Sequence, residues 1–493
     1  MSAILHRGGV ERLARTRIVE ILGGGMFAEV TAVRVPGRVV WCNYELAREI
    51  GFDVPAWPRM TRALHQQLVD ALSYRALQPG EEADGRPTIT LHADRYGGDG
   101  IAPYLGSARA AFAPWGDILL KGIGLTPLFQ THNEDDFPHS HGRAVMDESF
   151  VEALQCEVAF HLFSRTPARI LAIVDQDEII DFPDGRRFAG AVLARAGLQL
   201  RPAHVLAHDA LRNRWCRDVF VRITRETGQL VERDGLPDLK ATMLRVIDDQ
   251  AGAVAEQVRW RVTHGCISTS NMLMSGGMLD LVLQTTHPRL AGIAPAEKKN
   301  PERLYFRDYE DRVRQMGKVY RALRKNMSAD ERGQYRAGTI DARNAMSAAY
   351  RDHLDQALLC AAGLKAEAAR RVRSARPEVA RRFTDVLLRM GDLKNPASVE
   401  EAESLIERHA VLHVHQLLRN FPRAFFAAPD ADHRRVIHRE LHPIYRGNRH
   451  HVARKRRAVK RLIREFASAF AELMPVCAAH AADCYENARQ MRE

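Results

Sequence analysis

The chain has 493 residues, of which 46% are hydrophobic and 27% are charged, and its formal net charge is +11 at pH 7. This length favours two or more domains, and the composition is that of an ordinary soluble globular protein. No apolar run approaches the roughly 18 residues of a membrane span, and the N-terminal segment lacks the apolar core of a secretory signal, so a cytoplasmic protein is expected.

The cysteines and the positive charge give two weaker indications. Seven scattered cysteines, an odd number, fit reduced thiols better than a disulfide framework. Cys477, His480 and Cys484 have metal-ligand types at helical spacing, but without a fourth ligand nearby, two thiols on a helix are favoured over a zinc site. The net charge of +11 would suit a nucleic-acid partner, but it is weak evidence, because arginine outnumbers lysine as a GC-rich coding bias would also produce; nucleic acid is therefore not favoured as a partner.

Strand and helix patterns alternate through the first 300 residues. The β-branched runs at 29–35 and 168–174 predict strands. In CNYELAREIGF, Asn43 is the expected N-cap of a helix and Gly51 its expected C-terminal turn residue. Such alternation is typical of α/β or α+β domains.

Beyond residue 300 the pattern becomes helical. One apolar face is predicted from the spacing of Phe306, Tyr309, Val313, Met316, Tyr320 and Leu323. The segment RGNRHHVARKRRAVKRLIREFASAF near the C-terminus combines an apolar and a basic helical face. A docked helix with a solvated basic side is favoured there over a site for an anionic partner.

Two glycine-containing turns are candidate phosphate sites. LGGGMFAEV at 22–30 imitates a kinase glycine loop, but the first lysine of the chain, Lys121, comes too late for such a loop, so a turn into a strand is expected. YLGSARA at 104–110 shortly precedes the strand-like run that ends at Lys121. Its backbone N–H groups could approach phosphates that Arg109 and Lys121 neutralise.

A kinase-type lysine also needs a carboxylate to orient it, normally from a nearby helix. The stretch 147–162 has helical spacing and offers Glu152 and Glu157, either of which could pair with Lys121. The alternative is that both are surface acids.

Asn271 and Asp280 lie nine residues apart in HGCISTSNMLMSGGMLDL, as in the loops that hold catalytic magnesium in kinase-like phosphotransferases. Amide and carboxylate oxygens are ligands that Mg²⁺ accepts. The residue before Asn271, where such a loop could carry a carboxylate base, is Ser270. A usual proton acceptor is therefore missing.

Taken in order, segments between about residues 27 and 285 resemble the SelO (YdiU) family, kinase-fold proteins that bind ATP in a flipped orientation and transfer AMP to protein hydroxyls. LLKGIGLTP is similar to the family's LKGAGxTPYSR, HSHGRAVMDESFVEAL to GDGRAVLRSSIREFL, and HGCISTSNM to HGVMNTDNM. The resemblance implies ATP with Mg²⁺, or Mn²⁺ as the alternative ion, and a protein or peptide substrate.

The implied fold is α+β, a protein-kinase-like bilobal fold with an extended all-helical C-terminal region. The expected divisions are residues 1–150 for the lobe with the glycine turn and the lysine strand, 151–300 for the lobe with the metal loop, and 301–493 for the helical region.

Site residues follow from the resemblance position by position. Lys121 matches the phosphate-binding lysine, and Glu152 matches the helix glutamate that orients it. Asn271 and Asp280 match the metal ligands. The nucleotide contacts are matched by Gly106, Arg109, Gly142, Arg143, Arg195 and Arg201.

The chain also departs from the family pattern. Ala108 replaces a glycine of the turn YLGSARA, and His141 replaces the aspartate of the family's GDGRAV segment. One residue fewer separates Arg195 from Arg201 than in the family. Ser270 stands at the position of the catalytic aspartate base. The segment after Asp280 also differs from the family's sequence. The C-terminus lacks the family's redox-active cysteine or selenocysteine motif.

Three interpretations follow. AMP transfer to a carboxylate would need no base, because a carboxylate is already ionised at pH 7. AMP transfer to Ser, Thr or Tyr, or a kinase-type reaction, could proceed without early removal of the hydroxyl proton by a base. The third interpretation is an ATP-binding pseudoenzyme whose basic helical region binds a partner.

Four histidines lie near these segments. For His132, His139 and His141, a solvated polar loop is favoured over metal or phosphate contacts. For His264, before the metal loop, a core position is favoured.

Overall fold

The computed structural model describes residues 13–384 with gaps, and nothing is described beyond them. The segments left out are 57–59, 97–105, 130–136, 208–214, 261, 287–295, 298–299, 305, 326, 328–341, 362–368, 371–372, 375–376, 379 and 382–383. The expected basic helix, the cluster of Cys477, His480 and Cys484, and His132 therefore lie outside the described residues.

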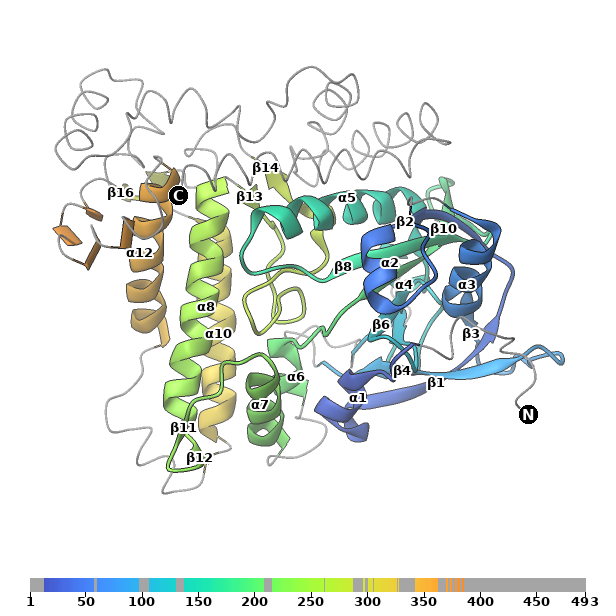
Figure 1. Ribbon diagram of the computed structural model, residues 1–493, viewed down its shortest axis with the longest axis horizontal. Coiled ribbons are helices and arrows are strands. Elements are labelled where there is room, and N and C mark those ends of the chain that lie inside the picture. Colours follow the sequence, from blue (N-terminus) through green and yellow to red (C-terminus); the bar gives the residue numbers. More distant parts are fainter. Residues whose placement is uncertain are drawn as a thin grey trace, which may run out of the picture.

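A ten-stranded sheet forms one side of the protein (Figure 1). Its order is β2-β8-β10-β6-β5-β4-β1-β3, with β7 and β9 also paired to β10, and every one of these pairs is antiparallel. The strands are β1 (Phe27–Arg34), β2 (Arg38–Cys42), β3 (Tyr74–Ala76), β4 (Thr88–Asp94), β5 (Ala110–Phe112), β6 (Ile118–Lys121), β7 (Ala144–Val145), β8 (Arg169–Asp175), β9 (Ile179–Asp181) and β10 (Arg187–Ala196).

The two strands expected from β-branched runs are confirmed as β1 and β8. β8 lies between β2 and β10, and its residues 170–174 are fully buried. A strand covered on both faces is apolar at consecutive positions, which explains why its sequence does not alternate.

Local signals also located the helix after Asn43 correctly. α2 (Tyr44–Ile50) begins after Asn43, whose Oδ1 accepts a hydrogen bond from Leu46 N at 3.1 Å, and it ends at Gly51 with a left-handed φ of 114°. The stretch 22–30 forms the short 3₁₀-helix η2 (Gly24–Met26) and then β1, so the expected turn into a strand is confirmed.

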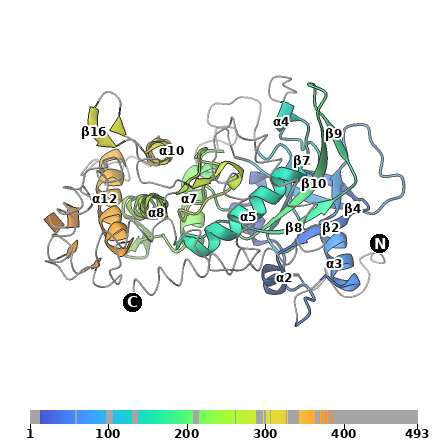
Figure 2. The same ribbon diagram turned by 90° about the horizontal axis from the view of Figure 1, so that it is seen from above.

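Helices cover both faces of the sheet. α2 and α3 (Arg62–Leu72) pack on one face, where Leu64 and Leu68 of α3 share a core with Leu120 and Val192 of the strands. α5 (Met146–Leu162) packs on β8 and β10 and lies between the sheet and the remaining helices (Figure 2). The expected helix at 147–162 is thereby confirmed.

The other side of the protein is helical. Its main helices are α7 (Trp215–Glu226), α8 (Leu239–Trp260), α10 (Arg307–Lys325) and α12 (Ala342–Ala361), and α1 (Arg17–Leu22) and α6 (Pro202–Leu206) are shorter. The short helix η5 (Leu281–Leu283) contacts α5. The short helix α4 (Phe137–Ser140) lies on the sheet side, where Phe137 packs with Ile180 of β9 and Phe188 of β10 (Figure 2). The apolar face expected on residues 306–323 is confirmed, since Val313, Met316 and Leu323 are buried. These helices share one core with Met272 and Met274, so this core continues across residue 300. The boundaries at residues 150 and 300 stay predictions.

Three short strand pairs complete the described structure. They are β11 (Glu232–Arg233) with β12 (Leu236–Pro237), β13 (Val262–Thr263) with β14 (Thr285–Thr286), and β15 (Ala296–Glu297) with β16 (Asn300–Leu304). The expectation of a purely helical chain from residue 301 is wrong at its start, because residues 300–304 pair with β15. In the described part of the chain, no helix combines the length and apolar character that crossing a bilayer requires.

Candidate functional site

Lys121 is the last residue of β6, a central strand. Residues 118–120 of this strand are buried, whereas the Lys121 side chain is 16% exposed. Lys121 pairs across the sheet with Ala110 of β5 and with Leu193 of β10. The apolar part of β6 therefore anchors the lysine at the end of a buried strand, where its ammonium group is partly accessible.

Glu152, and not Glu157, meets this lysine. Lys121 Nζ lies 3.3 Å from Glu152 Oε2, and the Glu152 side chain is only 1% exposed. Glu157 forms a bidentate ion pair with Arg169 instead, at 2.9 and 2.7 Å. Five residues turn an α-helix by about 140°, so the two glutamates of α5 point in different directions. Neither is the surface acid that the sequence left as an alternative.

Asn271 and Asp280 are brought together by a narrow loop. Met272 and Met278 form an antiparallel bridge, and Leu279 N donates a hydrogen bond to Asn271 O at 3.0 Å. Asp280 follows directly in a left-handed conformation, with φ 55° and ψ 58°, which aspartate tolerates better than most residues. Asn271 and Asp280, nine residues apart in the sequence, are thus brought close together by the loop.

Four charged side chains from four elements converge at this point. Asp280 Oδ1 accepts from Lys121 Nζ at 2.7 Å and from Arg195 Nη2 at 2.6 Å. Arg195, from the end of β10, also pairs with Glu152 and is 2% exposed. Two carboxylates therefore meet two cations in one compact group.

Electrostatics favour the charged forms of Asp280 and Arg195. Burial alone would raise the pKa of Asp280, but the neighbouring charges of Lys121 and Arg195 hold it well below its ordinary value. Burial likewise opposes the charge of Arg195, and Glu152 and Asp280 outweigh it, so its pKa is raised. Removing one partner would leave a buried charge uncompensated.

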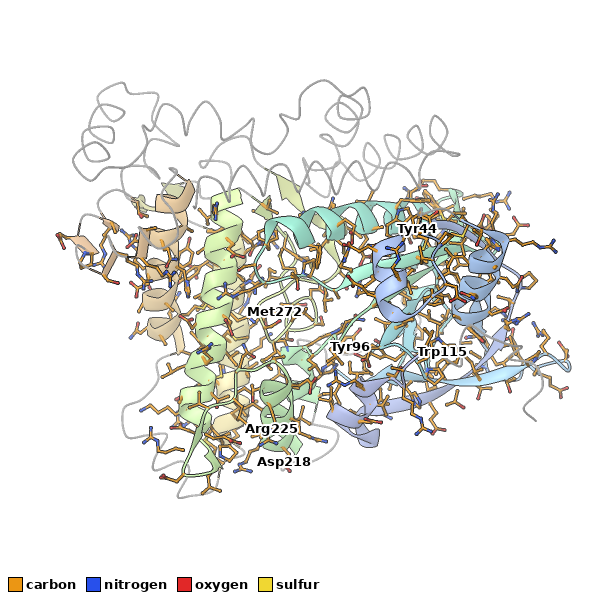
Figure 3. The ribbon with its side chains drawn as sticks, in the orientation of Figure 1. Tyr44, Tyr96, Trp115, Asp218, Arg225 and Met272 are labelled. Carbon is orange, nitrogen blue, oxygen red and sulfur yellow. The ribbon has the colours of Figure 1, made fainter. Side chains whose placement is uncertain are left out.

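Arg201 and Gln199 extend this group toward Ser270. Arg201 Nη1 donates to Ser270 O at 3.1 Å, and Gln199 Oε1 accepts from both Arg195 Nη1 and Arg201 Nη2 at 3.4 Å. The Arg201 guanidinium lies 4.7 Å from the centre of the Tyr96 ring, where the sheet side meets the helical side (Figure 3). The sequence did not indicate Gln199, because a lone glutamine in LARAGLQLRP carries no motif.

Unused donors gather between the two arginines. Among the described residues, Arg195 Nε, Gln199 Nε2 and Arg201 Nε are buried nitrogen atoms without a hydrogen-bond partner. Buried donors are normally paired, so each such atom calls for an explanation. Acceptor oxygens of a bound anion, such as a phosphate group, would provide suitable partners.

The hydroxyl of Ser270 has no carboxylate partner among the described residues. Ser270 Oγ lies 2.8 Å from Ser268 Oγ, and the Ser268 hydroxyl also accepts from Asn271 N at 3.2 Å. Two serine hydroxyls cannot supply the basicity of an aspartate at neutral pH.

The donor set of the loop suits a hard cation. Asn271 Nδ2 donates to Cys266 O at 3.1 Å, which leaves Asn271 Oδ1 as the side-chain acceptor. One amide oxygen and one carboxylate match Mg²⁺, which retains several waters and takes further oxygens from phosphates. No group of three or more His, Cys, Asp or Glu side chains suited to a metal occurs among the described residues.

The turns that carry Gly106 and Gly142 lie side by side. A Cβ atom on Gly106 would come within 2.2 Å of Asp94 O, and one on Gly142 within 2.8 Å of Gly124 C, so both positions require glycine. The Arg109 guanidinium donates to Arg143 O at 2.9 Å and joins the turns.

Arg143, one of the expected nucleotide contacts, forms an ion pair in this structure. Its Nε lies 2.9 Å from Glu178 Oε2, and burial lowers its pKa. The Glu178 carboxylate therefore already balances the Arg143 charge.

Among the flanking histidines, His264 is fully buried and His141 is partly buried. His141 packs beside the rings of Phe137 and Phe182, 5.3 and 5.7 Å away, in an aromatic cluster rather than in a solvated loop. His264 is fully buried, as expected, and its Nε2 lies 2.6 Å from Leu279 O. The side chain of His139 lies outside the described residues.

Asp308 is a second residue that the sequence did not indicate. It lies in the first turn of α10 and accepts hydrogen bonds from His264 N at 2.5 Å, Gly265 N at 3.2 Å and Gln257 Nε2 at 2.8 Å. An acidic residue in a first helical turn is ordinary. Only the tertiary structure shows that this one holds the start of the loop that carries Asn271 and Asp280.

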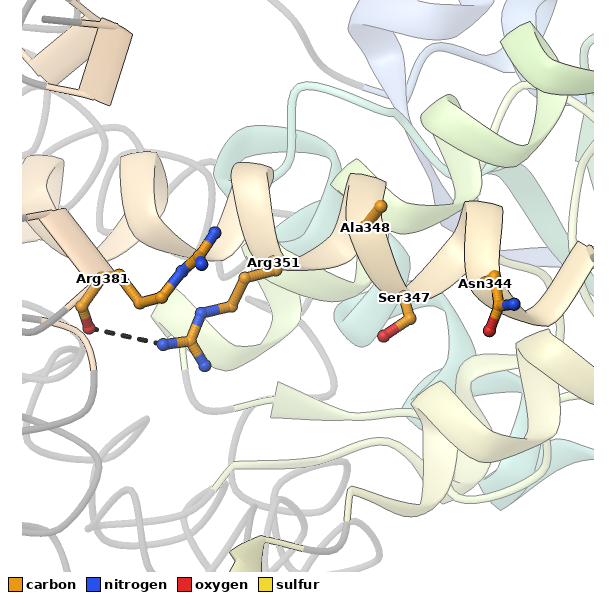
Figure 4. Close-up of a pocket in the computed structure, with 5 residues that line it drawn as sticks. All are labelled: Asn344, Ser347, Ala348, Arg351 and Arg381. Atoms are coloured by element: carbon orange, nitrogen blue, oxygen red, sulfur yellow. Dashed lines mark hydrogen bonds between the residues drawn. The ribbon is translucent and has the colours of Figure 1, made fainter. Parts of the chain in front are cut away.

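An open hollow of about 570 Å³ lies elsewhere, on α12 (Figure 4). It is lined by Asn344, Ser347, Ala348, Arg351 and Arg381. None of these residues belongs to the Lys121 group, and the hollow has no evident relation to the charged site.

These features define a mixed α+β protein in which a strand lysine, a helix glutamate and a loop aspartate meet beside a large antiparallel sheet. Such a combination of cations, carboxylates and buried donors is suited to binding a phosphate-bearing ligand.

Comparison with known proteins reveals a distant similarity to protein nucleotidyltransferases. No family model matches the chain. Curated relatives described as "Protein nucleotidyltransferase YdiU" are 30% identical over 258 residues in Corynebacterium efficiens, 26% over 249 in Shewanella putrefaciens and 25% over 264 in Shewanella loihica. These matches cover 48%, 50% and 52% of this chain and 47%, 47% and 50% of the relatives. The chain thus spans about half the length of the curated relatives it matches.

Proposed function

We propose that this protein is an ATP-dependent nucleotidyltransferase with a kinase-like fold that transfers AMP to a group on a protein or peptide. The observation that carries the proposal is the convergence of Lys121, Glu152, Arg195 and Asp280. The name of the distant relatives supports the same class of reaction.

The cations would bind the phosphates. Glu152 orients Lys121 and Arg195 from the buried side, so that both ammonium and guanidinium groups are held before ATP arrives. Such preorganisation is the main way a protein stabilises the charge that develops in phosphate transfer. Arg201 adds a third positive charge within reach of the Ser270 backbone.

Asn271 and Asp280 would hold Mg²⁺, with Mn²⁺ as the alternative ion. When bound, the ion neutralises phosphate charge. The Asp280 carboxylate that would bind the ion also contacts Lys121, at 2.7 Å.

A carboxylate is the acceptor that best fits Ser270. An ionised carboxylate oxygen can form a bond to the α-phosphorus while the bond from that phosphorus to the bridging oxygen of the β-phosphate breaks. Pyrophosphate leaves, and no proton needs to be removed from the acceptor. A serine in place of the usual base would then cost little.

Other acceptors lead to different products. A hydroxyl acceptor would yield a phosphodiester, a kinase-type reaction would release ADP, and a pseudoenzyme would bind ATP without releasing either pyrophosphate or ADP. The dissociative character of phosphate transfer keeps a hydroxyl acceptor feasible without an aspartate base.

The proposal is tested by incubating the full-length protein with labelled ATP, Mg²⁺ and cell lysate. Pyrophosphate release with a hydroxylamine-labile label is expected, because hydroxylamine cleaves acyl adenylates and spares phosphodiesters. Lys121→Ala and Asp280→Ala should abolish turnover, whereas Asp181→Ala, at an exposed position of β9, should not. Release of ADP alone, or of neither product, would contradict AMP transfer.

A further inference from the structure

A buried chain of polar contacts lies beside the charged site. β4 ends at Asp94, and α6 begins directly after Arg201 and carries His204. Asp94, His204 and Arg201 are 0%, 1% and 2% exposed. Three polar residues this deeply buried require mutual hydrogen bonds.

His204 uses both ring nitrogens. Its Nε2 lies 3.1 Å from Asp94 Oδ2, and its Nδ1 accepts a hydrogen bond from Arg201 N at 3.1 Å. Since Nδ1 accepts, the ring proton is assigned to Nε2, which donates to Asp94. Burial lowers the pKa of His204, which favours this neutral form.

Asp94 connects the same histidine to the glycine turn. Its backbone oxygen accepts from Ser107 N at 2.9 Å, and its Oδ1 accepts from the Ser107 hydroxyl. Gly106, next to Ser107, is the position where a Cβ atom would collide with Asp94 O. The series of hydrogen bonds from His204 through Asp94 thus ends at the turn of Gly106, which could face phosphates.

Arg201 lies at the other end of this series of hydrogen bonds, and several contacts fix the position of its guanidinium group. His204 holds its backbone, Ser270 O and Gln199 Oε1 accept from its guanidinium, and Tyr96 covers one face. Among the described residues, no carboxylate forms an ion pair with Arg201. Although burial opposes the charge of Asp94, Arg201 is the strongest influence that lowers its pKa, to about 2.

We propose that Asp94 and His204 are positioning residues, which hold Arg201 so that its guanidinium meets the phosphate groups of ATP. Neither residue contacts the nucleotide; both act through Arg201. This inference rests on the proposed function, because it assigns a cause to the placement of one of its three cations.

The test measures ATP affinity of the full-length protein by calorimetry with Mg²⁺. His204→Asn retains an acceptor for Arg201 N but cannot reach Asp94, and we expect it to weaken ATP binding about tenfold. In an Arg201→Ala background the same substitution should cause no further loss, since no guanidinium remains to be positioned. His353→Asn is the matched control, because His353 pairs with Asp248 between α12 and α8 at 3.0 Å, and it should leave affinity unchanged.

Each result decides the inference. Wild-type affinity in His204→Asn, or an equal loss in the presence and absence of Arg201, would overturn it and leave the proposed function standing. Failure of the wild-type protein to bind ATP would overturn both. If His204→Asn does not fold, Asp94→Asn, which preserves side-chain size, serves for the same double-mutant comparison.

Discussion

Lys121 and Asp280 are 159 residues apart in the chain and are joined by an ion pair of 2.7 Å. Arg195 contacts the same carboxylate oxygen. Lys121 and Arg195 therefore share the carboxylate that, together with Asn271, would hold a divalent ion.

Glu152 should be needed for both stability and nucleotide binding. Glu152→Gln removes the negative charge that holds Lys121 and Arg195, and we expect it to lower the free energy of unfolding by about 2 kcal/mol and to weaken ATP binding. Glu157→Gln, on the same helix but paired with Arg169, should cost similar stability and spare ATP binding. Urea unfolding and calorimetry on both variants distinguish the two roles. Equal ATP affinities would contradict the assignment.

A negative charge at position 199 should stabilise the fold and weaken ATP binding. In Gln199→Glu, a carboxylate would lie between Arg195 and Arg201, whose guanidinium groups both donate to the present side chain. We expect a higher midpoint of thermal unfolding together with weaker ATP binding, because the new charge competes with phosphates. Gln199→Met is the uncharged control and should lower the midpoint. Tighter ATP binding in Gln199→Glu would argue against a phosphate site here.

Ser270 should be dispensable if the acceptor is a carboxylate. Its hydroxyl contacts only Ser268 Oγ in the described structure, and its backbone oxygen, which holds Arg201, is unaffected by substitution. Ser270→Ala should therefore retain the rate of pyrophosphate release within about twofold, less than the effect of losing a general base. A much larger loss would assign the hydroxyl a direct part in the reaction.

Asp94 should make stability depend on acid pH. Its pKa is about 2 in the folded protein against an ordinary 3.8, so its ionised form stabilises the fold above pH 4, and this contribution is lost as pH falls from about 4 to 2. The shift corresponds to on the order of 2 kcal/mol. Between pH 5 and pH 3, Asp94→Asn should lose less stability than the wild type, as measured by urea unfolding. Asp234→Asn, at an exposed position of the β11–β12 turn, should behave as the wild type does.

Local signals predicted individual elements well. The caps of α2, the strands β1 and β8, and the helix periodicity of α5 and α10 each depend on residues within a few positions of one another. The sequence also indicated both glutamates of α5 as candidates. It could not choose between them, because that choice depends on which side of the helix faces β6 and β10.

The sequence by itself determined which chemical groups are present: a strand lysine, an acidic helix, an amide and a carboxylate nine residues apart, and a serine before them. The tertiary structure alone decided their partners. It paired Arg143 with Glu178, placed Gln199 between two arginines, and brought Asp308 next to His264, at the start of the loop that carries Asn271 and Asp280. The physical reason is that these contacts join distant segments, whose approach is set by strand order and helix packing, whereas sequence patterns report only the geometry of neighbouring residues.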